Sequence, residues 1–327
     1  MLIAGDVGGT KTRLAIYEEG GRPIPQHETV YTSDKFAHLE DIVDQFIHET
    51  GATITRAVFG LPGPVIQGTV QVTNLPWTVN VQDMQSALDV DDVILLNDLE
   101  ATAYAIPFLP ESDLHVLHEG QDIPEGNKVV VAPGTGLGEA ILFHHKGQYI
   151  ASPTEGGHTD FAPRNLFEIN LLQYLMGKFG HVSYERICSG IGIPQIYEYI
   201  AHSTYEKENP QVQERLNAAE DKTPIIVQAA LDKESTLCGE TLEAFVRILG
   251  NEAGNMALNV LAKGGVYLGG GIPPRILPSL QDGTFISAFV DKGRFSEMLQ
   301  NIPVYVILND KAALYGAAVY ALGWCEV

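Results

Sequence analysis

The sequence has few cysteines and few basic residues. Its three cysteines, Cys188, Cys238 and Cys325, are odd in number and far apart, and no CxxC pair occurs. This spacing indicates neither a disulfide framework nor a zinc site, and it favours reduced cysteines in a cytoplasmic protein. Only 20 lysines and arginines oppose 41 aspartates and glutamates, giving a net charge of −21. That balance argues against nucleic-acid or anionic-membrane partners, because both require a basic surface.

Long apolar runs and targeting signals are also missing. No apolar stretch approaches the roughly 20 residues that span a bilayer, so we expect no membrane partner. The N-terminal residues do not follow the pattern of a signal peptide. The chain does contain 45% hydrophobic residues in a length of 327, which is enough for a substantial core. Two domains are the expectation for a chain of this length.

Two stretches share one plan, in which a turn rich in glycine joins two apolar runs. They are Leu2–Tyr17 and Lys128–Phe143. Glycine lets a turn adopt φ > 0, and backbone amides at such a tip can cradle a phosphate. The alternative is an ordinary hairpin turn, and the first stretch alone does not decide between them. The repeated plan indicates a weak internal duplication. Neither turn has the spacing of a P-loop or a Rossmann dinucleotide site.

Helices and strands are expected to alternate along the chain. Apolar residues recur at spacings of three and four over Phe36–Ile47 and Leu242–Val260, which predicts two amphipathic helices. The apolar run Asp92–Leu96 predicts a strand buried on both faces. His181–Gly190 is predicted to begin a helix, with Ser183 as its N-cap. This alternation favours an α/β fold.

Several polar residues suit chemistry, and each has a plainer alternative. Asp98 follows a predicted strand, where ligands collect in open α/β sheets, yet an aspartate before a helix is commonly an N-cap, which is the preferred interpretation for Asp98 alone. Glu155 and His158 flank two glycines that allow a sharp turn, although a solvated loop would look the same. Glu185 can equally be an exposed helix residue, and Asn74 can equally be a turn residue. Together these groups suit a polyhydroxylated ligand, and no hydrolase triad motif is present.

Short motifs recur in a fixed order along nearly the whole chain. They are GDVGGT (5–10), LPGPV (61–65), TNLPW (73–77), LLNDLEATAYAI (95–106), PGTGLG (133–138), EGGHTDFAP (155–163), HVSYERICSG (181–190), GGVYLGGGIPPR (264–275) and FVDKGRF (289–295). In this order they resemble the motifs of bacterial-type glucokinases, within the actin/hexokinase/Hsp70 ATPase superfamily. EGGHTDFAP is specific to this group, whereas GGT alone is not.

The resemblance implies an α/β, two-domain actin-like ATPase (ribonuclease H-like) fold with an interdomain cleft. We expect a small α/β domain comprising residues 1–108 plus 303–327, and a large α/β domain comprising 109–302. The implied activity is that of a glucokinase, which phosphorylates the glucose 6-hydroxyl with ATP. The implied state is a cytoplasmic homodimer whose cleft closes on the sugar and excludes water.

The resemblance also implies roles for individual residues. Asp98 would be the general base. The sugar would be held by Asn74, Asn97, Asp98, Glu155, His158 and Glu185. ATP would be held by Asp6, Gly8, Gly9, Thr10, Lys11, Gly134, Thr135, Gly136, Gly269, Gly270, Gly271 and Ile272. Asp6 would also orient Mg²⁺ through water.

Two alternatives stay open at this point. One is a kinase of another hexose or of an N-acetylhexosamine, and the other is a sugar- and nucleotide-binding regulator without turnover. The related repressor/ORF/kinase sugar kinases share GGTKT (8–12) but usually carry a cysteine-rich zinc motif, which is missing here. No DNA-binding segment precedes residue 1, which we expect to disfavour a sugar-responsive repressor.

Overall fold

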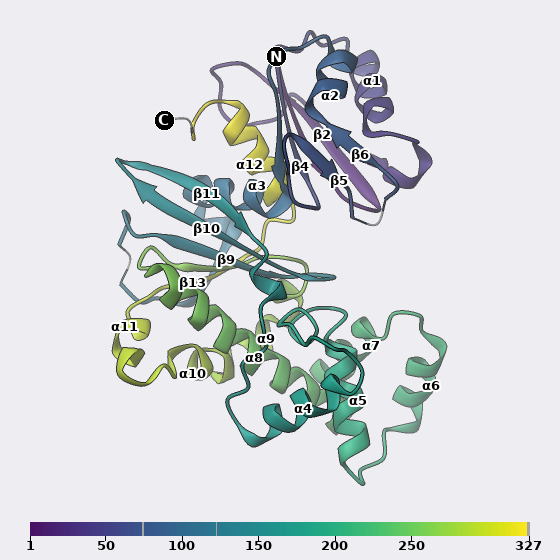
Figure 1. Ribbon diagram of the computed structural model, residues 1–327, viewed down its shortest axis with the longest axis vertical. Coiled ribbons are helices and arrows are strands. Elements are labelled where there is room, and N and C mark those ends of the chain that lie inside the picture. The colour runs from purple at the N-terminus through teal and green to yellow at the C-terminus, as the bar shows by residue number, and fades with distance from the viewer. Residues whose placement is uncertain (74, 122, 326–327) are drawn as a thin grey trace. The chain divides into compact units, whose positions relative to one another are not determined.

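The computed structural model describes residues 1–73, 75–121 and 123–325 (Figure 1). These residues form an α/β structure with two main sheets. Asn74, one of the residues assigned to the sugar, lies outside the described residues. Within the described part of the chain, no helix has the length and apolar character needed to cross a membrane. The chain divides into two compact units, of which the first comprises 1–113, 140–153 and 309–327 and the second 114–139 and 154–308.

The first sheet has five strands in the order β3-β2-β1-β4-β7. Their bounds are β1 (Leu2–Val7), β2 (Lys11–Tyr17), β3 (His27–Thr32), β4 (Arg56–Leu61) and β7 (Val93–Asn97). β1 pairs antiparallel with β2 and parallel with β4, and β4 pairs parallel with β7. The predicted hairpin over the first glycine turn is therefore confirmed, as is the buried strand that ends at the polar pair 97–98.

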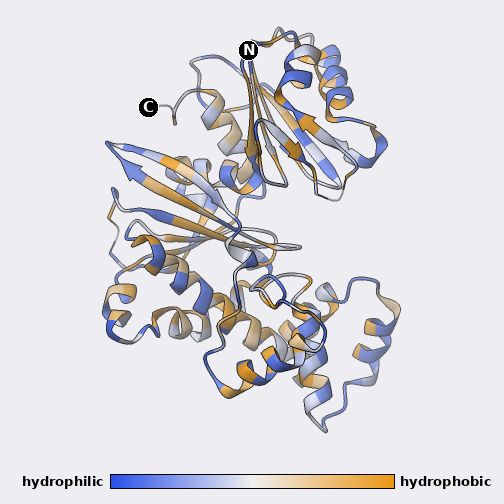
Figure 2. Cartoon of the chain, viewed as in Figure 1, coloured by the Kyte–Doolittle hydropathy of each residue, from blue (hydrophilic) through white to orange (hydrophobic). Residues whose placement is uncertain are grey.

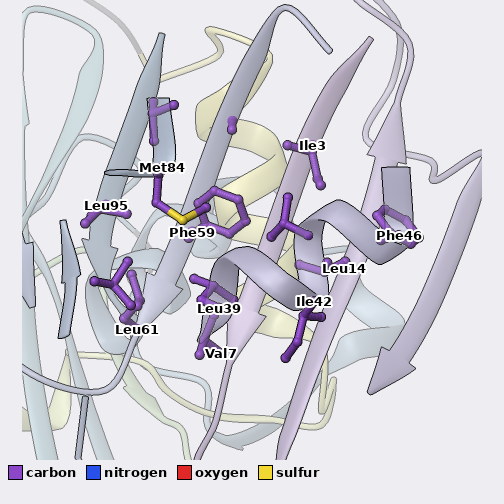
Figure 3. Close-up of a cluster of buried hydrophobic side chains, with 14 of the residues drawn as sticks. Ile3, Val7, Leu14, Leu39, Ile42, Phe46, Phe59, Leu61, Met84 and Leu95 are labelled. Carbon is purple, nitrogen blue, oxygen red and sulfur yellow. The ribbon is translucent and has the colours of Figure 1, made fainter. Parts of the chain in front are cut away.

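Helix α1 (Leu39–Thr50) packs its apolar face against this sheet (Figure 3). Ile42 and Phe46 of the helix are fully buried in one cluster with Ile3 and Phe59 of the strands. Burying each such side chain contributes roughly 1.5–3 kcal/mol relative to exposure. The same helix carries hydrophilic residues as well (Figure 2), so the predicted amphipathic helix is confirmed.

Several further elements of the first unit are short. They are β5 (Thr69–Gln71), β6 (Thr78–Asn80), α2 (Val81–Leu88), α3 (Asp98–Ala105) and α12 (Ala312–Ala321). α12 approaches α3 closely at Gly316, where a Cβ atom would collide with the carbonyl oxygen of Ala101. A larger residue at this position would force the two helices apart.

The second sheet has six strands in the order β11-β10-β9-β12-β13-β8. Their bounds are β8 (Leu114–His118), β9 (Lys128–Pro133), β10 (Leu137–His145), β11 (Gln148–Thr154), β12 (Val266–Leu268) and β13 (Val304–Ile307). Five of them repeat the order of the first sheet, since β9, β10, β11, β12 and β13 take the places of β1, β2, β3, β4 and β7. β12 is parallel to β9 and to β13, as β4 is to β1 and β7. This repeat supports the internal duplication that the glycine turns indicated.

The compact units differ from the expected domain boundaries at several segments. Residues 109–113 and 140–153 fall in the first unit, although we expected them in the large domain. Residues 303–308, expected in the small domain, fall in the second unit. For residues 303–308 the reason is strand pairing, because β13 is bonded to β12, with Val304 opposite Val266, and belongs to the second sheet.

Helices make up most of the rest of the second unit. They are α4 (Leu166–Met176), α5 (Ile193–Ser203), α6 (Pro210–Ala218), α7 (Thr223–Leu231), α8 (Thr236–Val260), α9 (Leu277–Leu280), α10 (Thr284–Val290) and α11 (Ser296–Gln300). α8 confirms the helix predicted from apolar spacing, and Ser235 caps it by accepting a hydrogen bond from Cys238 N at 3.1 Å. Gly254 lets α8 approach α10, because a Cβ there would lie 2.6 Å from the carbonyl oxygen of Phe289.

The helix predicted to begin within His181–Gly190 is wrong. These residues form turns and bends, and the next α-helix is α5. Residues 182–185 bond through their backbone to the EGGHTDFAP segment, and the local bonds that follow form a single turn, from Arg186 N to Ser183 O and from Ile187 N and Cys188 N to Tyr184 O. Ser183 forms a β-bridge with Asp160, and Glu185 N donates to Gly157 O at 2.9 Å. Pairing with a distant segment thus overrides the local helical composition.

Candidate active site

Asn97 and Asp98 lie where β7 turns into α3. Asn97 is the N-cap, because its Oδ1 accepts hydrogen bonds from Leu99 N at 3.0 Å and Glu100 N at 3.3 Å. Its Nδ2 donates to Gly63 O at 3.1 Å. Asp98 is the first helical residue, and its Oδ1 accepts from Leu99 N at 2.8 Å. The interpretation of Asp98 as the cap is therefore wrong, because Asn97 has that role.

The position of Asp98 depends on a small residue in the neighbouring strand. A Cβ at Gly60 would lie 3.1 Å from Ala101 Cβ and 3.6 Å from Asp98 Cα, so glycine lets α3 lie close to β4. Asp98 consequently sits at the carboxyl ends of two parallel strands, β4 and β7. This is where ligands bind in open α/β sheets. The helix N-terminus also favours a negative charge there.

The first glycine turn, Gly8–Thr10, is held from two sides. Gly8 N donates to Lys11 O at 2.9 Å, which closes the hairpin. Ser33 Oγ donates to Gly8 O at 2.8 Å, and Ser33 N donates to Thr10 O at 3.0 Å. The side chains of Thr10 and Lys11 are exposed. The turn is thus fixed through its carbonyl groups, a geometry that suits a phosphate cradle and equally an ordinary hairpin.

Asp6 lies on β1 directly opposite Arg13 of β2. Burial raises the pKa of Asp6 to about 6, while the charge of Arg13 opposes that rise. Arg13 also donates to Asp310, at 2.6 Å to Oδ2 and 2.8 Å to the carbonyl oxygen. Sequence reasoning missed Arg13 and Asp310. A signal was present, because LND at 308–310 repeats LND at 96–98, after strands in corresponding positions of the two sheets.

His158 lies between two carboxylates that the sequence also singled out. Its Nδ1 is 3.5 Å from Glu155 Oε2, and its Nε2 is 3.7 Å from Glu185 Oε1. The side chains of Glu155 and His158 are 66% and 60% exposed, whereas that of Glu185 is 21% exposed. Glu185 Oε2 accepts a hydrogen bond from Leu137 N at 3.0 Å. The structure therefore brings together three groups that are complementary to hydroxyls and leaves two of them accessible.

The two glycines between Glu155 and His158 are required by close contacts. A Cβ at Gly157 would collide with the carbonyl oxygen of Leu137, and one at Gly156 would collide with the carboxyl group of Glu139. Glycine thus lets a short 3-10 turn, 156–158, lie directly on β10. The two glycines predict the sharp turn, but Glu139 beneath it is not among the residues that the sequence motifs single out.

The second glycine turn, 134–136, adjoins the same carboxylate. Gly134 N donates to Gly136 O at 2.9 Å, and Gly190 N donates to Gly134 O at 2.8 Å. A Cβ at Gly136 would collide with Glu185 Oε2. A glycine assigned to ATP therefore also makes room for a side chain assigned to the sugar. Ile191 N donates to Thr135 O at 3.2 Å, which ties this turn to the 181–190 segment.

The third glycine run, 269–271, lies against the start of this second turn. Gly270 has φ +77°, and a Cβ there would lie 2.5 Å from the carbonyl oxygen of Pro133. Ile272 N donates to that same oxygen at 3.3 Å. Two of the three segments assigned to ATP are thus adjacent in space. At Gly134 and Gly271 a Cβ would meet nothing within 4 Å, so backbone there is open to a ligand.

A nucleotide and its cation can be compared with the groups available. Glycine backbone at 134–136 and 270–271 suits phosphate oxygens. Among residues 1–73, 75–121 and 123–325, no group of three or more His, Cys, Asp or Glu side chains is placed to hold a metal ion. Asp6 offers a single carboxylate. That is compatible with Mg²⁺, which commonly retains waters and binds through one or two carboxylates plus substrate phosphates.

Comparison with known proteins places this geometry in a family. The family model described as Glucokinase matches residues 3–323. The chain belongs to the glucokinase family. Among curated relatives, the glucokinase of Nostoc punctiforme is 39% identical over 338 residues, covering 98% of each chain. The family resemblance that the motifs predicted is therefore confirmed over nearly the full length.

Solved glucokinase structures agree with the fold. A glucokinase from an Antarctic psychrotroph matches with a TM-score of 0.85 and 29% identity, covering 98% of each chain. The glucokinase of Balamuthia mandrillaris, solved with glucose, matches with a TM-score of 0.82 over 98% of this chain and 93% of that one. At 20% identity the second match supports the fold alone. As a member of the glucokinase family, the chain is an ATP-dependent glucose kinase.

Proposed function

We propose that the chain transfers the γ-phosphoryl group of ATP to the 6-hydroxyl of glucose, with Asp98 as general base. A carboxylate within hydrogen-bond reach of that hydroxyl can take its proton as the phosphoryl group moves. The observation that carries the proposal is the placement of His158 between Glu155 and Glu185. Sugar hydroxyls both donate and accept hydrogen bonds, and a set of acids and imidazole complements them.

The other sugar contacts follow from the same residues. In this proposal Asn97 contributes a second hydrogen of Nδ2, because the first is donated to Gly63 O. Asn74 is included among the proposed sugar-binding residues because of the motif resemblance. Holding the sugar hydroxyls in one orientation makes the reaction with bound ATP effectively unimolecular. This can lower the activation barrier by roughly 7–11 kcal/mol in favourable cases.

The glycine segments are proposed to bind ATP. Gly8, Gly9, Thr10, Lys11 and the 134–136 turn would receive the phosphates, and 269–272 would line the nucleoside. Because the chain carries a net charge of −21, backbone amides and a local cation must offset the phosphate charge. Asp6 would hold Mg²⁺ through water, and the bound ion would supply charge neutralisation at the phosphates.

Three further features are proposed for this chain. The strand order β3-β2-β1-β4-β7 and its repeat support an actin-like, ribonuclease H-like fold with a cleft that closes on sugar. Such closure would exclude water, which otherwise competes as phosphoryl acceptor. A homodimer and a cytoplasmic location follow the family resemblance.

The test is ATP-dependent product formation with a panel of acceptors. Glucose, fructose and N-acetylmannosamine would be compared by kcat/KM in the presence of Mg²⁺. We expect glucose 6-phosphate to form with the highest kcat/KM. A higher value for another acceptor would favour a different hexose or N-acetylhexosamine kinase. Tight glucose and ATP binding with no product would instead favour a regulator without turnover.

A further inference from the structure

Glu139 is a fully buried acid that lies beneath the proposed sugar-binding turn. It belongs to β10 and is 1% exposed. Neither of its carboxyl oxygens has a hydrogen-bond donor among the described residues. Its close neighbour is a second buried acid, Glu252 of α8, and the two carboxyl groups lie near enough to share a hydrogen bond once one of them is protonated. A hydrogen bond between two carboxyl groups requires a proton on one of them.

The surroundings determine which acid carries that proton. Glu252 Oε2 accepts a hydrogen bond from Asn255 Nδ2 at 2.9 Å, and the hydroxyl of Tyr184 also bonds to Glu252. Lys292 adds a positive charge nearby, with its Nζ 2.6 Å from Asn255 Oδ1. Glu139 has no such donors. Glu252 is thus the carboxylate, and Glu139 is the neutral acid that donates to it.

The pair is linked directly to the turn that holds Glu155 and His158. The Glu139 carboxyl group occupies the space where a Cβ of Gly156 would be. Thr154 Oγ1 donates to Glu139 O at 2.9 Å and accepts from Gly156 N at 3.1 Å. The Glu139 side chain and backbone therefore both support the turn between the two sugar-facing residues.

The same network also reaches the third sugar-facing residue. Tyr184, whose hydroxyl accepts from Asn255 Nδ2 at 2.9 Å, immediately precedes Glu185. Glu185 N donates to Gly157 O at 2.9 Å, so the two segments are joined above the acid pair. A change at Glu139 and Glu252 can thus move all three groups.

We infer that Glu139 is a positioning residue for glucose, and that the proton it shares with Glu252 must be retained for the sugar-binding turn to keep its place. This inference rests on the proposed sugar-binding role of Glu155, His158 and Glu185. When the proton is lost, two adjoining carboxylates are buried together. Their repulsion is strong away from water, and Glu139 has no donor to stabilise its charge. The carboxylate can gain water by displacing Gly156, which would weaken glucose binding.

Other titratable groups face the Glu139–Glu252 pair, and their effects on the pH profile must be distinguished from the effect of the pair. Burial and the two acids raise the pKa of Cys188, and burial with Glu252 raises that of Tyr184, so both stay neutral as alkali is added. Burial lowers the pKa of Lys292 to about 8, with Arg164 acting in the same direction and Glu252 and Asp291 opposing it. Burial and Glu252 raise the pKa of Glu139 to about 8. Lys292 and Glu139 thus titrate in one range, and a variant must distinguish them.

The test is the pH dependence of KM for glucose in the wild type and in Glu139→Gln. The glutamine amide can donate to Glu252 as the acid does, yet it does not titrate. We expect wild-type KM to rise above pH 8, by at most about tenfold per pH unit for release of one proton. The Glu139→Gln variant should keep the neutral KM within about twofold and lose the alkaline rise. A flat wild-type profile, or an unchanged rise in Glu139→Gln that points to Lys292, would overturn the inference.

Two further measurements separate this inference from stability and from the proposed function. Glu168→Gln is a matched control, because Glu168 is also fully buried but accepts a hydrogen bond from Arg247 Nε at 3.1 Å. The Glu168→Gln variant should be less stable than the wild type and should retain the rise of glucose KM above pH 8. The infrared C=O band of a protonated carboxyl group should be present in the wild type at neutral pH and reduced in Glu139→Gln. That band reports the shared proton even if no glucose 6-phosphate forms, and its absence in the wild type would contradict the pair.

Discussion

Asn97 caps the helix whose first residue is Asp98. The amide oxygen of Asn97 accepts from the backbone amides at 99 and 100, at 3.0 and 3.3 Å, so it closes the first turn of α3. Capping is thereby provided by the residue next to Asp98. This division of roles applies to two adjacent polar residues at the junction of β7 and α3, and it leads to different expectations for the two positions.

Asp98→Asn should abolish most turnover while leaving the fold intact. The amide is nearly the same size but cannot accept the hydroxyl proton, so kcat should fall by roughly 10²- to 10⁴-fold. KM for glucose should change less, because the hydrogen-bonding shape is retained. Coupled measurement of glucose 6-phosphate gives both constants. A variant that keeps most of the wild-type kcat would remove Asp98 from the role of general base.

Asn97→Ala should mainly lower stability. Loss of an N-cap costs about 1 kcal/mol, and the bond to Gly63 O is lost as well. Asn97→Asp is the matched control, because aspartate caps about as well but cannot donate. The free energy of unfolding, measured with denaturant, should therefore decrease from wild type to Asn97→Asp and further to Asn97→Ala. Both variants should raise KM for glucose if Nδ2 meets a hydroxyl, and an unchanged KM in both would take Asn97 out of the sugar site.

Gly136→Ala should impair glucose binding through Glu185. The added Cβ would collide with Glu185 Oε2, which must then leave its bond with Leu137 N and shift relative to His158. We expect KM for glucose to rise, with a further effect on KM for ATP if this turn cradles phosphate. Gly239→Ala is the control, since a Cβ there meets nothing within 4 Å and alanine favours the α8 helix. Equal glucose KM values in the two variants would contradict this coupling.

The sequence predicted best where one local pattern decides the structure. Apolar spacing predicted α1 and α8, because apolar residues recur every three or four positions in both helices, and the glycine turns marked two hairpins with the same plan. It failed at 181–190, where the local composition favours a helix. There the backbone bonds to a distant segment, as between Glu185 N and Gly157 O. No pattern within a short window encodes that partner.

The buried residues around the site could not be singled out from the sequence for the same reason, because their partners lie far away along the chain. Glu139 stands in a strand and Glu252 on a helix, and each looks like one acid among many in an acidic chain. A signal existed, because Glu252 interrupts the regularly spaced apolar residues of α8, a helix that is buried along much of its length. Likewise Asp310 was visible only through the repeat of LND. Such residues acquire meaning when topology places a second charged group beside them.

Asp6→Asn should stabilise the protein and reduce its activity. Burial raises the pKa of Asp6 from 3.8 to about 6, so the ionised form is disfavoured in the folded state. Between these values the folded protein binds more protons than the unfolded chain, and stability therefore falls as pH rises through this range. Above about pH 6 the full free-energy cost of burying the ionised Asp6 carboxylate is present. Since one pKa unit corresponds to about 1.4 kcal/mol, the variant should gain up to about 3 kcal/mol at pH 7.

That gain should disappear near pH 4, because Asp6 is then largely neutral in both states. Denaturant unfolding of Asp6→Asn and wild type at the two pH values measures the difference directly. If Asp6 holds Mg²⁺ through water, the variant should also require more Mg²⁺ for half-maximal turnover, since an amide attracts the hydrated cation less than a carboxylate. A variant that is no more stable at pH 7 would show that Arg13 offsets the cost of burial. An unchanged Mg²⁺ requirement would assign the cation to other groups and leave Asp6 with an electrostatic role toward Arg13 alone.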